Sequence, residues 1–225
     1  HEIGVPGDFT PQLNFTLPVA YTVSNYTYDI PMGLITREDI AHDVPGNSFI
    51  RLEKEGGAAF IVTDTKYGFR GHDNAGSVTL IRSSVDPDLY PEFGVHHFNL
   101  GIGVCGISEQ KELASGFVHP LSFCAATKHA GKLPLCGSLM TFDAGENVMI
   151  SGVKNGEDGG LIVRVSDISG QGGRVSLTLS DSIGVPSGAA LVDITERHEL
   201  AKCDIDGRKI GFDLKPYSMA TVKID

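Results

Sequence analysis

Histidine and carboxylate side chains are the groups in this sequence that could bind a metal ion or transfer protons. His96 and His97 are adjacent in a segment expected to be extended, so their side chains should point to opposite faces and cannot easily hold one ion together. His72 and Asp73 lie in one predicted turn, and the remaining histidines have no spacing typical of zinc ligands. We therefore predict no metal site, and we interpret the histidines as surface or hydrogen-bonding residues.

Carboxylates are numerous, but none of them forms a pattern typical of catalysis. Glu53, Glu55, Asp64 and Asp73 surround a predicted reversal of the chain, where turns favour Asp because its side chain bonds nearby backbone groups. The segment 101–106 matches G-x-G-x-x-G literally but lacks the strand–helix–strand context of a dinucleotide site. The sequence contains no nucleophile elbow and no phosphate-binding loop. It therefore predicts no catalytic residue.

The elements that would position these side chains are mainly strands. Two β-rich apolar runs at 60–62 and 78–81, separated by a polar stretch with several glycines, predict a β-hairpin. Residues 12–23 predict a strand that Pro18 makes an edge or bulged strand. The segment 108–117 predicts a short helix with Ser108 as its N-cap and Gly116 just past its end. Further strands are expected at 25–30, 48–53 and 95–103. The last of these would have an apolar face of His96, Phe98, Leu100 and Ile102. Residues 33–47 are expected to be irregular, and 36–39 could form one helical turn.

After residue 135, short strands recur between turns rich in Gly, Asn and Asp. Such spacing is typical of an antiparallel β-sandwich. The expected strands are 138–142, 148–153, 161–167, 174–179, 190–194, 209–214 and 219–224.

Composition narrows the class of protein. The 225 residues carry a formal charge of −10, which argues against nucleic acid or an anionic membrane as partner because both select clustered Lys and Arg. No apolar run approaches the roughly 20 residues of a spanning helix, and the first residues do not form a signal peptide. The cysteines, which we expect to be free thiols in a reducing compartment, are Cys105, Cys124, Cys136 and Cys203. We expect a cytoplasmic, bacterial protein cut from something longer.

Four segments in order resemble the C-terminal β region of glycoside hydrolase family 38, the retaining α-mannosidases. They are Tyr28-Asp29-Ile30-Pro31-Met32-Gly33, then Asp64-Thr65-Lys66-Tyr67-Gly68-Phe69 with the strand ending Leu80-Ile81-Arg82-Ser83-Ser84, then Asp86-Pro87-Asp88 with Gly94-Val95-His96-His97-Phe98, and finally Leu214-Lys215-Pro216-Tyr217-Ser218-Met219-Ala220-Thr221.

The resemblance implies an all-β fold in two parts. Residues 1–125 would be the late portion of a mutarotase-like supersandwich, residues 126–135 a linker, and residues 136–225 a small antiparallel β-sandwich. Strands missing from the first part would leave sheet edges or apolar faces uncovered.

The resemblance also implies a function. The chain would be a non-catalytic part of a zinc-dependent, retaining α-mannosidase, with the zinc and the catalytic residues in a catalytic domain outside this chain. Its partners would be that domain and carbohydrate (mannosides), and homo-oligomers of the parent protein are left open. Expected contacts with sugar or with the catalytic domain are Tyr67, Arg70, His96 and His97. Glu92-Phe93-Gly94 stands where many relatives place an Asp-Arg-Gly-type loop, so an arginine contact is lost or moved there.

Two alternatives remain open at this point. A free-standing carbohydrate-binding β-sandwich would normally expose aromatic side chains, and the absence of Trp weakens it. An aldose epimerase would need an acid and a base across one sugar pocket, for which Glu53 with His72 or His97 are the available groups.

Overall fold

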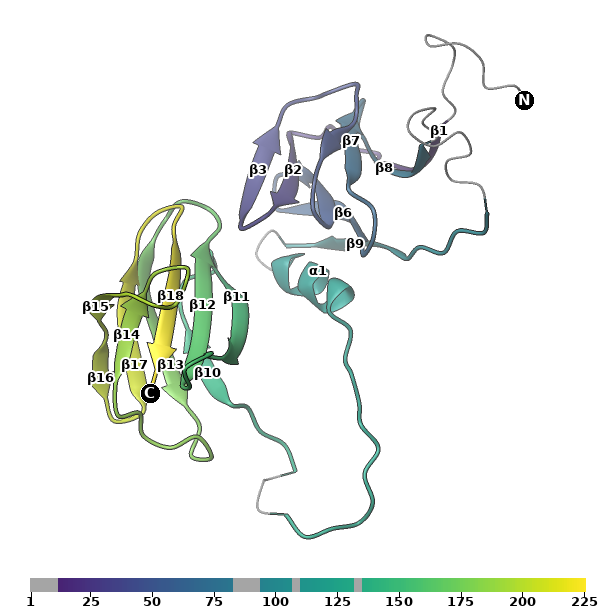
Figure 1. The fold of residues 1–225 in the computed structure, drawn as a ribbon. Helices are drawn as coiled ribbons and strands as arrows, with labels where there is room; N and C mark the ends of the chain where they lie inside the picture. The colour runs from purple at the N-terminus through teal and green to yellow at the C-terminus, as the bar shows by residue number, and fades with distance from the viewer. Residues whose placement is uncertain (1–11, 83–93, 107–109, 132–134) are drawn as a thin grey trace. The chain divides into compact units, whose positions relative to one another are not determined.

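Antiparallel strands dominate the part of the chain that the computed structural model describes, namely residues 12–82, 94–106, 110–131 and 135–225. The chain divides into two compact units, His1–Ser122 and Phe123–Asp225 (Figure 1). The assignment of 126–135 as a linker stays a prediction. The family-like segment Asp86-Pro87-Asp88, residues Glu92 and Phe93, and the helix cap Ser108 lie outside the described residues.

The first unit contains two antiparallel sheets that pack face to face. The four-stranded sheet has the order β1 (Gln12–Pro18), β8 (Ala75–Arg82), β7 (Gly68–His72), β4 (Val44–Pro45). The five-stranded sheet has the order β3 (Gly33–Arg37), β2 (Asn25–Ile30), β5 (Phe49–Lys54), β6 (Gly57–Thr63), β9 (Leu100–Cys105). The core between the sheets includes Tyr28 and Ile61 from one and Phe69 and Val78 from the other.

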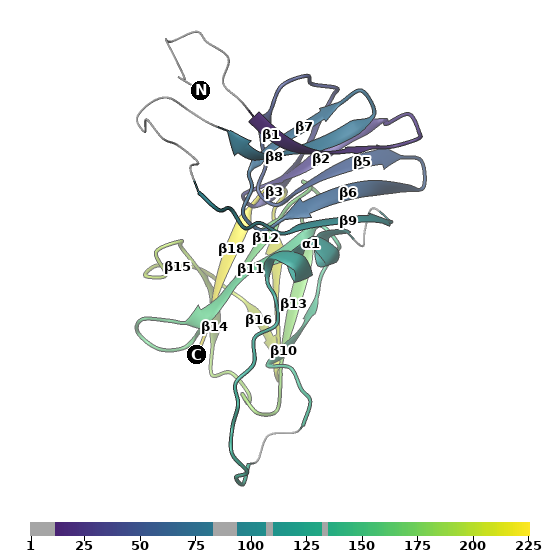
Figure 2. The same ribbon diagram turned by 90° about the vertical axis from the view of Figure 1, so that its right-hand side faces the viewer.

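Helix α1 (Gln110–Val118) covers the opposite face of the five-stranded sheet, beside β6 and β9 (Figure 2). Phe60 and Val62 of β6 belong to a second apolar cluster that includes Ala114 of the helix. Because layers cover both faces of β6, all of its residues are buried and it reads as a continuous apolar run.

The second unit is a sandwich of two antiparallel sheets around one apolar core. The first sheet has the order β10 (Met140–Asp143), β13 (Gly173–Leu179), β17 (Lys209–Leu214), β16 (Asp204–Asp206). The second has the order β11 (Val148–Asn155), β12 (Leu161–Asp167), β18 (Met219–Ile224), β14 (Ala189–Val192), β15 (Glu199–Lys202). Val163 and Val222 of one sheet and Leu177 and Ile210 of the other are fully buried in this core. The all-β prediction is confirmed.

The predicted hairpin between 60–62 and 78–81 is wrong. β6 pairs with β5 and β9, whereas β8 pairs with β1 and β7 in the other sheet. The stretch expected to be a turn contains β7, whose Phe69 is fully buried. The hairpin is instead β7–β8, and its two-residue turn is Asp73-Asn74, with φ of 50° and 54° as such turns require.

Other expectations failed at particular residues. Residues 33–37 form β3, and Thr36 bonds Thr27 across the ladder instead of starting a helical turn. The strand expected at 95–103 begins only at Leu100, and Ile102 on its predicted apolar face is 59% exposed. Gly116 lies inside α1 and does not end it. Strands β15 and β16 were not predicted.

The strand predicted at 12–23 is confirmed as β1 up to Pro18, where it ends; it lies at a sheet edge and has an irregular register at Leu13/Asn14. In the part of the chain that the structure describes, no helix is long and apolar enough to cross a membrane.

Candidate functional site

Two neighbouring loops of the first unit carry three of the four predicted contact residues. This loop pair consists of residues 64–67, between β6 and β7, and residues 95–99, which lead into β9. Asn99 Nδ2 donates a hydrogen bond of 2.8 Å to Asp64 Oδ2, and Lys66 Nζ lies 5.5 Å from the centroid of the Phe98 ring. The two contacts hold the loops together.

The side chains that the loop pair presents are polar and aromatic. Tyr67 is 60% exposed, His97 is exposed and His96 is half-buried. The hydrogen bond from Asn99 lowers the pKa of the Asp64 carboxyl below its ordinary value. The pair therefore presents the Tyr67 phenol and the His97 imidazole, groups that can hydrogen-bond sugar hydroxyls.

Arg70 lies on the outer face of the four-stranded sheet, where Asp43 engages it. Its Nη2 and Nε donate to Asp43 Oδ1 over 2.8 and 3.0 Å. Asp43 Oδ2 also accepts from Thr79 Oγ1 at 2.6 Å and Gln12 Nε2 at 2.5 Å. Burial raises the pKa of Asp43, but the hydrogen bonds from Thr79, Arg70 and Gln12 outweigh it and the net pKa is lowered. Arg70 therefore has a structural partner, and a sugar contact for it stays a prediction.

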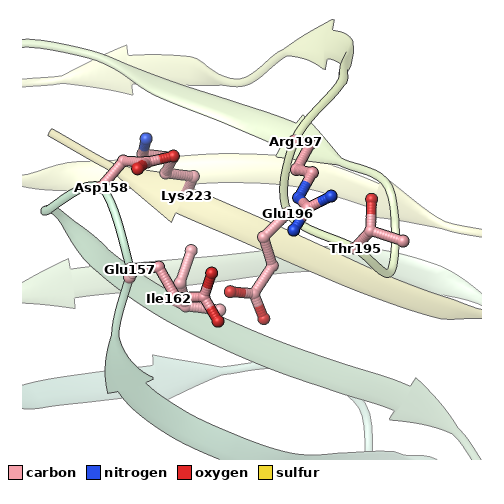
Figure 3. Close-up of a pocket in the computed structure, with 8 residues that line it drawn as sticks. Glu157, Asp158, Ile162, Thr195, Glu196, Arg197 and Lys223 are labelled. Atoms are coloured by element: carbon pink, nitrogen blue, oxygen red, sulfur yellow. The ribbon is translucent and has the colours of Figure 1, made fainter.

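A charged crevice in the second unit was not predicted. The turn after β14 places Glu196 at φ 64°, where its Oε1 accepts from Arg164 and Lys154 at 2.9 Å each. Figure 3 shows Glu157 and Ile162 on one side of the crevice and Glu196 on the other. The crevice has a volume of about 20 Å³, room for a single water and too small for a sugar ring.

A larger hollow of about 270 Å³ lies along the β10–β13 edge of the other sheet. It is smaller than typical ligand pockets, which occupy roughly 300–1,000 Å³. Arg208 and Asp181, which line it, form an ion pair with each other. Its charged groups are therefore already neutralised.

Asp167, at the end of β12, is a buried acid that sequence reasoning missed. Its Oδ1 accepts from Asn147 Nδ2 at 2.9 Å and Ser169 N at 3.2 Å, and its Oδ2 accepts from Gly172 N at 2.9 Å and Tyr217 N at 2.8 Å. Burial raises its pKa, but these four donors outweigh that effect and lower it to about 2. Every lone-pair direction of the carboxylate is thus used to join three loops, which is a structural role.

Metal binding has no support among the described residues, where no group of three His, Cys, Asp or Glu side chains could hold an ion. Glu53 bonds Arg51 and Thr27, and His72 bonds Asp39. Glu53 and His72, one acid–base pair considered for an epimerase, are therefore engaged in separate structural contacts, and a pairing of Glu53 with His97 stays a prediction.

Family comparisons agree with the resemblance seen in the sequence. Residues 9–90 match the glycosyl hydrolases family 38 C-terminal domain, and residues 147–222 match the glycosyl hydrolases family 38 C-terminal beta sandwich domain. Together the two matches cover more than half of the chain, in the order expected.

Individual relatives are much longer than this chain. An alpha-mannosidase of Saccharomyces cerevisiae is 29% identical over 102 residues, which are 44% of this chain and 9% of that protein. A glycosyl hydrolase family 38 protein from Enterococcus faecalis superposes with a TM-score of 0.75 at 17% identity, over 95% of this chain and 26% of its own. An alpha-mannosidase from Enterococcus faecalis V583 superposes with a TM-score of 0.73 at 16% identity, again over 95% of this chain and 26% of its own. At these identities the two solved structures establish the fold alone. This chain therefore belongs to glycosyl hydrolase family 38, and it corresponds to the C-terminal region of proteins in that family.

Proposed function

We propose that this chain is the non-catalytic C-terminal part of a retaining, zinc-dependent α-mannosidase. The observation that carries the proposal is the ordered match of two C-terminal family 38 domains, supported by a yeast relative named alpha-mannosidase. The described residues do not fit a zinc ion, because they contain no suitable ligand group. We therefore assign the metal and the catalytic carboxylates to a separate catalytic domain.

The first task of the chain in such an enzyme is to support the catalytic domain. Ile102 and Val104 on edge strand β9 are 59% and 80% exposed. They pair with Ile61 and Ala59 of β6, which are buried in the core. Ile102 and Val104 therefore extend the apolar face of the five-stranded sheet onto β9, where the four-stranded sheet no longer covers it. Contact with the rest of the enzyme would bury this face.

The second task is to shape the rim of the active site. The loop pair supports this role because it holds Tyr67, His96 and His97 at one end of the first unit with two inter-loop contacts. Arg70 is a weaker candidate because Asp43 engages it. The four cysteines form no disulfide with one another, which suits a reducing compartment such as the bacterial cytoplasm.

An activity assay tests the proposal. The isolated chain and the full-length parent are incubated with an aryl α-mannoside and zinc, and release of the aryl group is followed. We expect turnover by the parent only. Appreciable turnover by the isolated chain would overthrow the non-catalytic role, and an inactive parent would overthrow the mannosidase assignment. Titration of the isolated chain with mannose oligosaccharides tests the alternative, a carbohydrate-binding module, which requires millimolar or tighter binding.

A further inference from the structure

The segment that follows α1 exposes large apolar side chains to solvent. Every residue from 119 to 131 is exposed, and the segment forms neither helix nor strand. Leu121 and Phe123 within it are 101% and 96% exposed. We name residues 119–131 the strap. Exposed apolar side chains that lie close together can mark a site where a partner binds.

The strap has the form of an extended ligand. Its large apolar side chains stand two residues apart, so in an extended chain they project to the same side. Its backbone takes no part in any of the sheets of the described residues. Segments of this kind bind in grooves that offer apolar pockets for alternate side chains and hydrogen bonds for the backbone.

The charges around the strap indicate which side chains such a groove would contain. Residues 113–142 contain no Asp or Glu, although the chain has 28 acidic residues, and they include Lys128 and Lys132. A groove that combines apolar pockets with carboxylates would complement this segment, because opposite charges steer association and fix orientation.

The lengths of the relatives indicate where such a groove lies. The two Enterococcus faecalis structures described above carry this fold in about a quarter of a longer chain, at 26% coverage. The strap falls between the two family matches, at 9–90 and 147–222, so neither domain description accounts for it. We propose that the strap docks Leu121 and Phe123 into an acid-lined apolar groove on the remaining part of the family 38 polypeptide. This inference rests on the proposed function.

Limited trypsin digestion after Lys128 tests the docking, because the bond lies in the exposed strap. We expect rapid cleavage in the isolated chain and cleavage at least about tenfold slower in the full-length parent, where docking closes the site. The double variant Leu121→Ser/Phe123→Ser of the parent should return to rapid cleavage. The control Leu200→Ser removes another exposed leucine, at 67% exposure, and should leave the protection unchanged.

Three results would overturn the inference. They are rapid cleavage of the unmodified parent, equal protection of the double variant, and protection of the isolated chain that rises with its own concentration, which would identify a second copy as the occupant. The mannosidase assay on the same parent separates this inference from the proposed function. A parent that is active but rapidly cut refutes the docking alone, and a protected but inactive parent refutes the mannosidase assignment alone.

Discussion

Replacing Asp167 by Asn tests whether a buried carboxylate holds the second unit together. Asp167 is 2% exposed and accepts four hydrogen bonds. Asp167→Asn keeps the shape of the side chain but converts one acceptor oxygen into an NH₂ group. Whichever way the amide is oriented, two of the four donors lose their acceptor.

The expected loss follows from those two donors. Leaving a buried donor without an acceptor costs about 1–3 kcal/mol. Two such donors predict that the free energy of unfolding of the second unit falls by about 3 kcal/mol, allowing for partial relaxation of the loops. At 1.4 kcal/mol for each factor of ten, the open population of this unit should rise about 100-fold.

The native cysteines allow each unit to be measured separately. Cys203 lies in the core of the second unit, and Cys105 lies in an apolar cluster of the first. Burial raises the pKa of the Cys203 thiol to about 11, which suppresses its reaction in the folded state. Thiol labelling followed by peptide mass spectrometry should therefore show Cys203 reacting about 100-fold faster in Asp167→Asn, with Cys105 unchanged.

Asp193→Asn is the matched control. The Asp193 carboxylate accepts from Thr195 Oγ1 at 2.8 Å, Arg197 N at 3.0 Å and His198 N at 3.3 Å. These donors belong to exposed residues, so water can replace the lost acceptor and the effect should stay below about 1 kcal/mol. Equal effects of the two substitutions, or faster labelling of Cys105 in Asp167→Asn, would refute the reasoning.

Three further outcomes are expected. The folded pKa of Asp167, about 2, lies below the ordinary 3.8, so its contribution is complete above pH 3.8 and is lost as pH falls towards 2. Urea unfolding of the second unit should show this loss, and Asp167→Asn should abolish it. A Cβ on Gly71 would lie 2.3 Å from the Tyr26 ring, so Gly71→Ala should destabilise the first unit by about 1–3 kcal/mol. A Cβ on Gly116 would meet no atom within 4 Å, so Gly116→Ala should stabilise α1 by about 0.5–1 kcal/mol. The rate of Cys105 labelling measures both effects. Asn99→Ala should speed amide exchange in the loop pair and leave the core strands unchanged, and unchanged exchange in the loops would contradict the proposed tie.

The strands of the second unit were predictable because local signals agree there. β12, β17 and β18 begin and end at the predicted residues. Each is a short β-rich run bounded by turn residues, and the sandwich core confirms the apolar positions. β15 and β16 gave no such signal, because nearly all of their side chains are exposed and carry no apolar alternation.

The pairing of strands in the first unit could not be predicted from the same signals. β6 is buried on both faces, so its sequence does not reveal which sheet it joins. β7 was mistaken for a turn because Gly68 and Gly71 suggest one, whereas the close approach of the Tyr26 ring explains Gly71. Tertiary contacts therefore determine which strands pair in the first unit, because local propensity does not.

The hydrogen bonds and ion pairs between distant residues were even harder to predict from the sequence. Asp43 and Arg70 are 27 residues apart, and Asp64 and Asn99 are 35 residues apart. No local pattern links residues at such separations, because the fold alone brings them together.

The way this chain uses its charges explains why its functional assignment depends on the family and not on a site. Arg70 is held by Asp43, Arg164 by Glu196, and Arg174 by Asp204. A catalytic carboxyl pair needs one member kept protonated by an apolar or like-charged environment, yet each Asp of the described residues with a shifted pKa is shifted downwards. The lowered pKa values keep these carboxylates ionised and hydrogen-bonded, which agrees with the supporting role proposed for the chain. β9 and the strap both expose large apolar side chains, and these are the surfaces where we expect the catalytic domain of the proposed enzyme to bind.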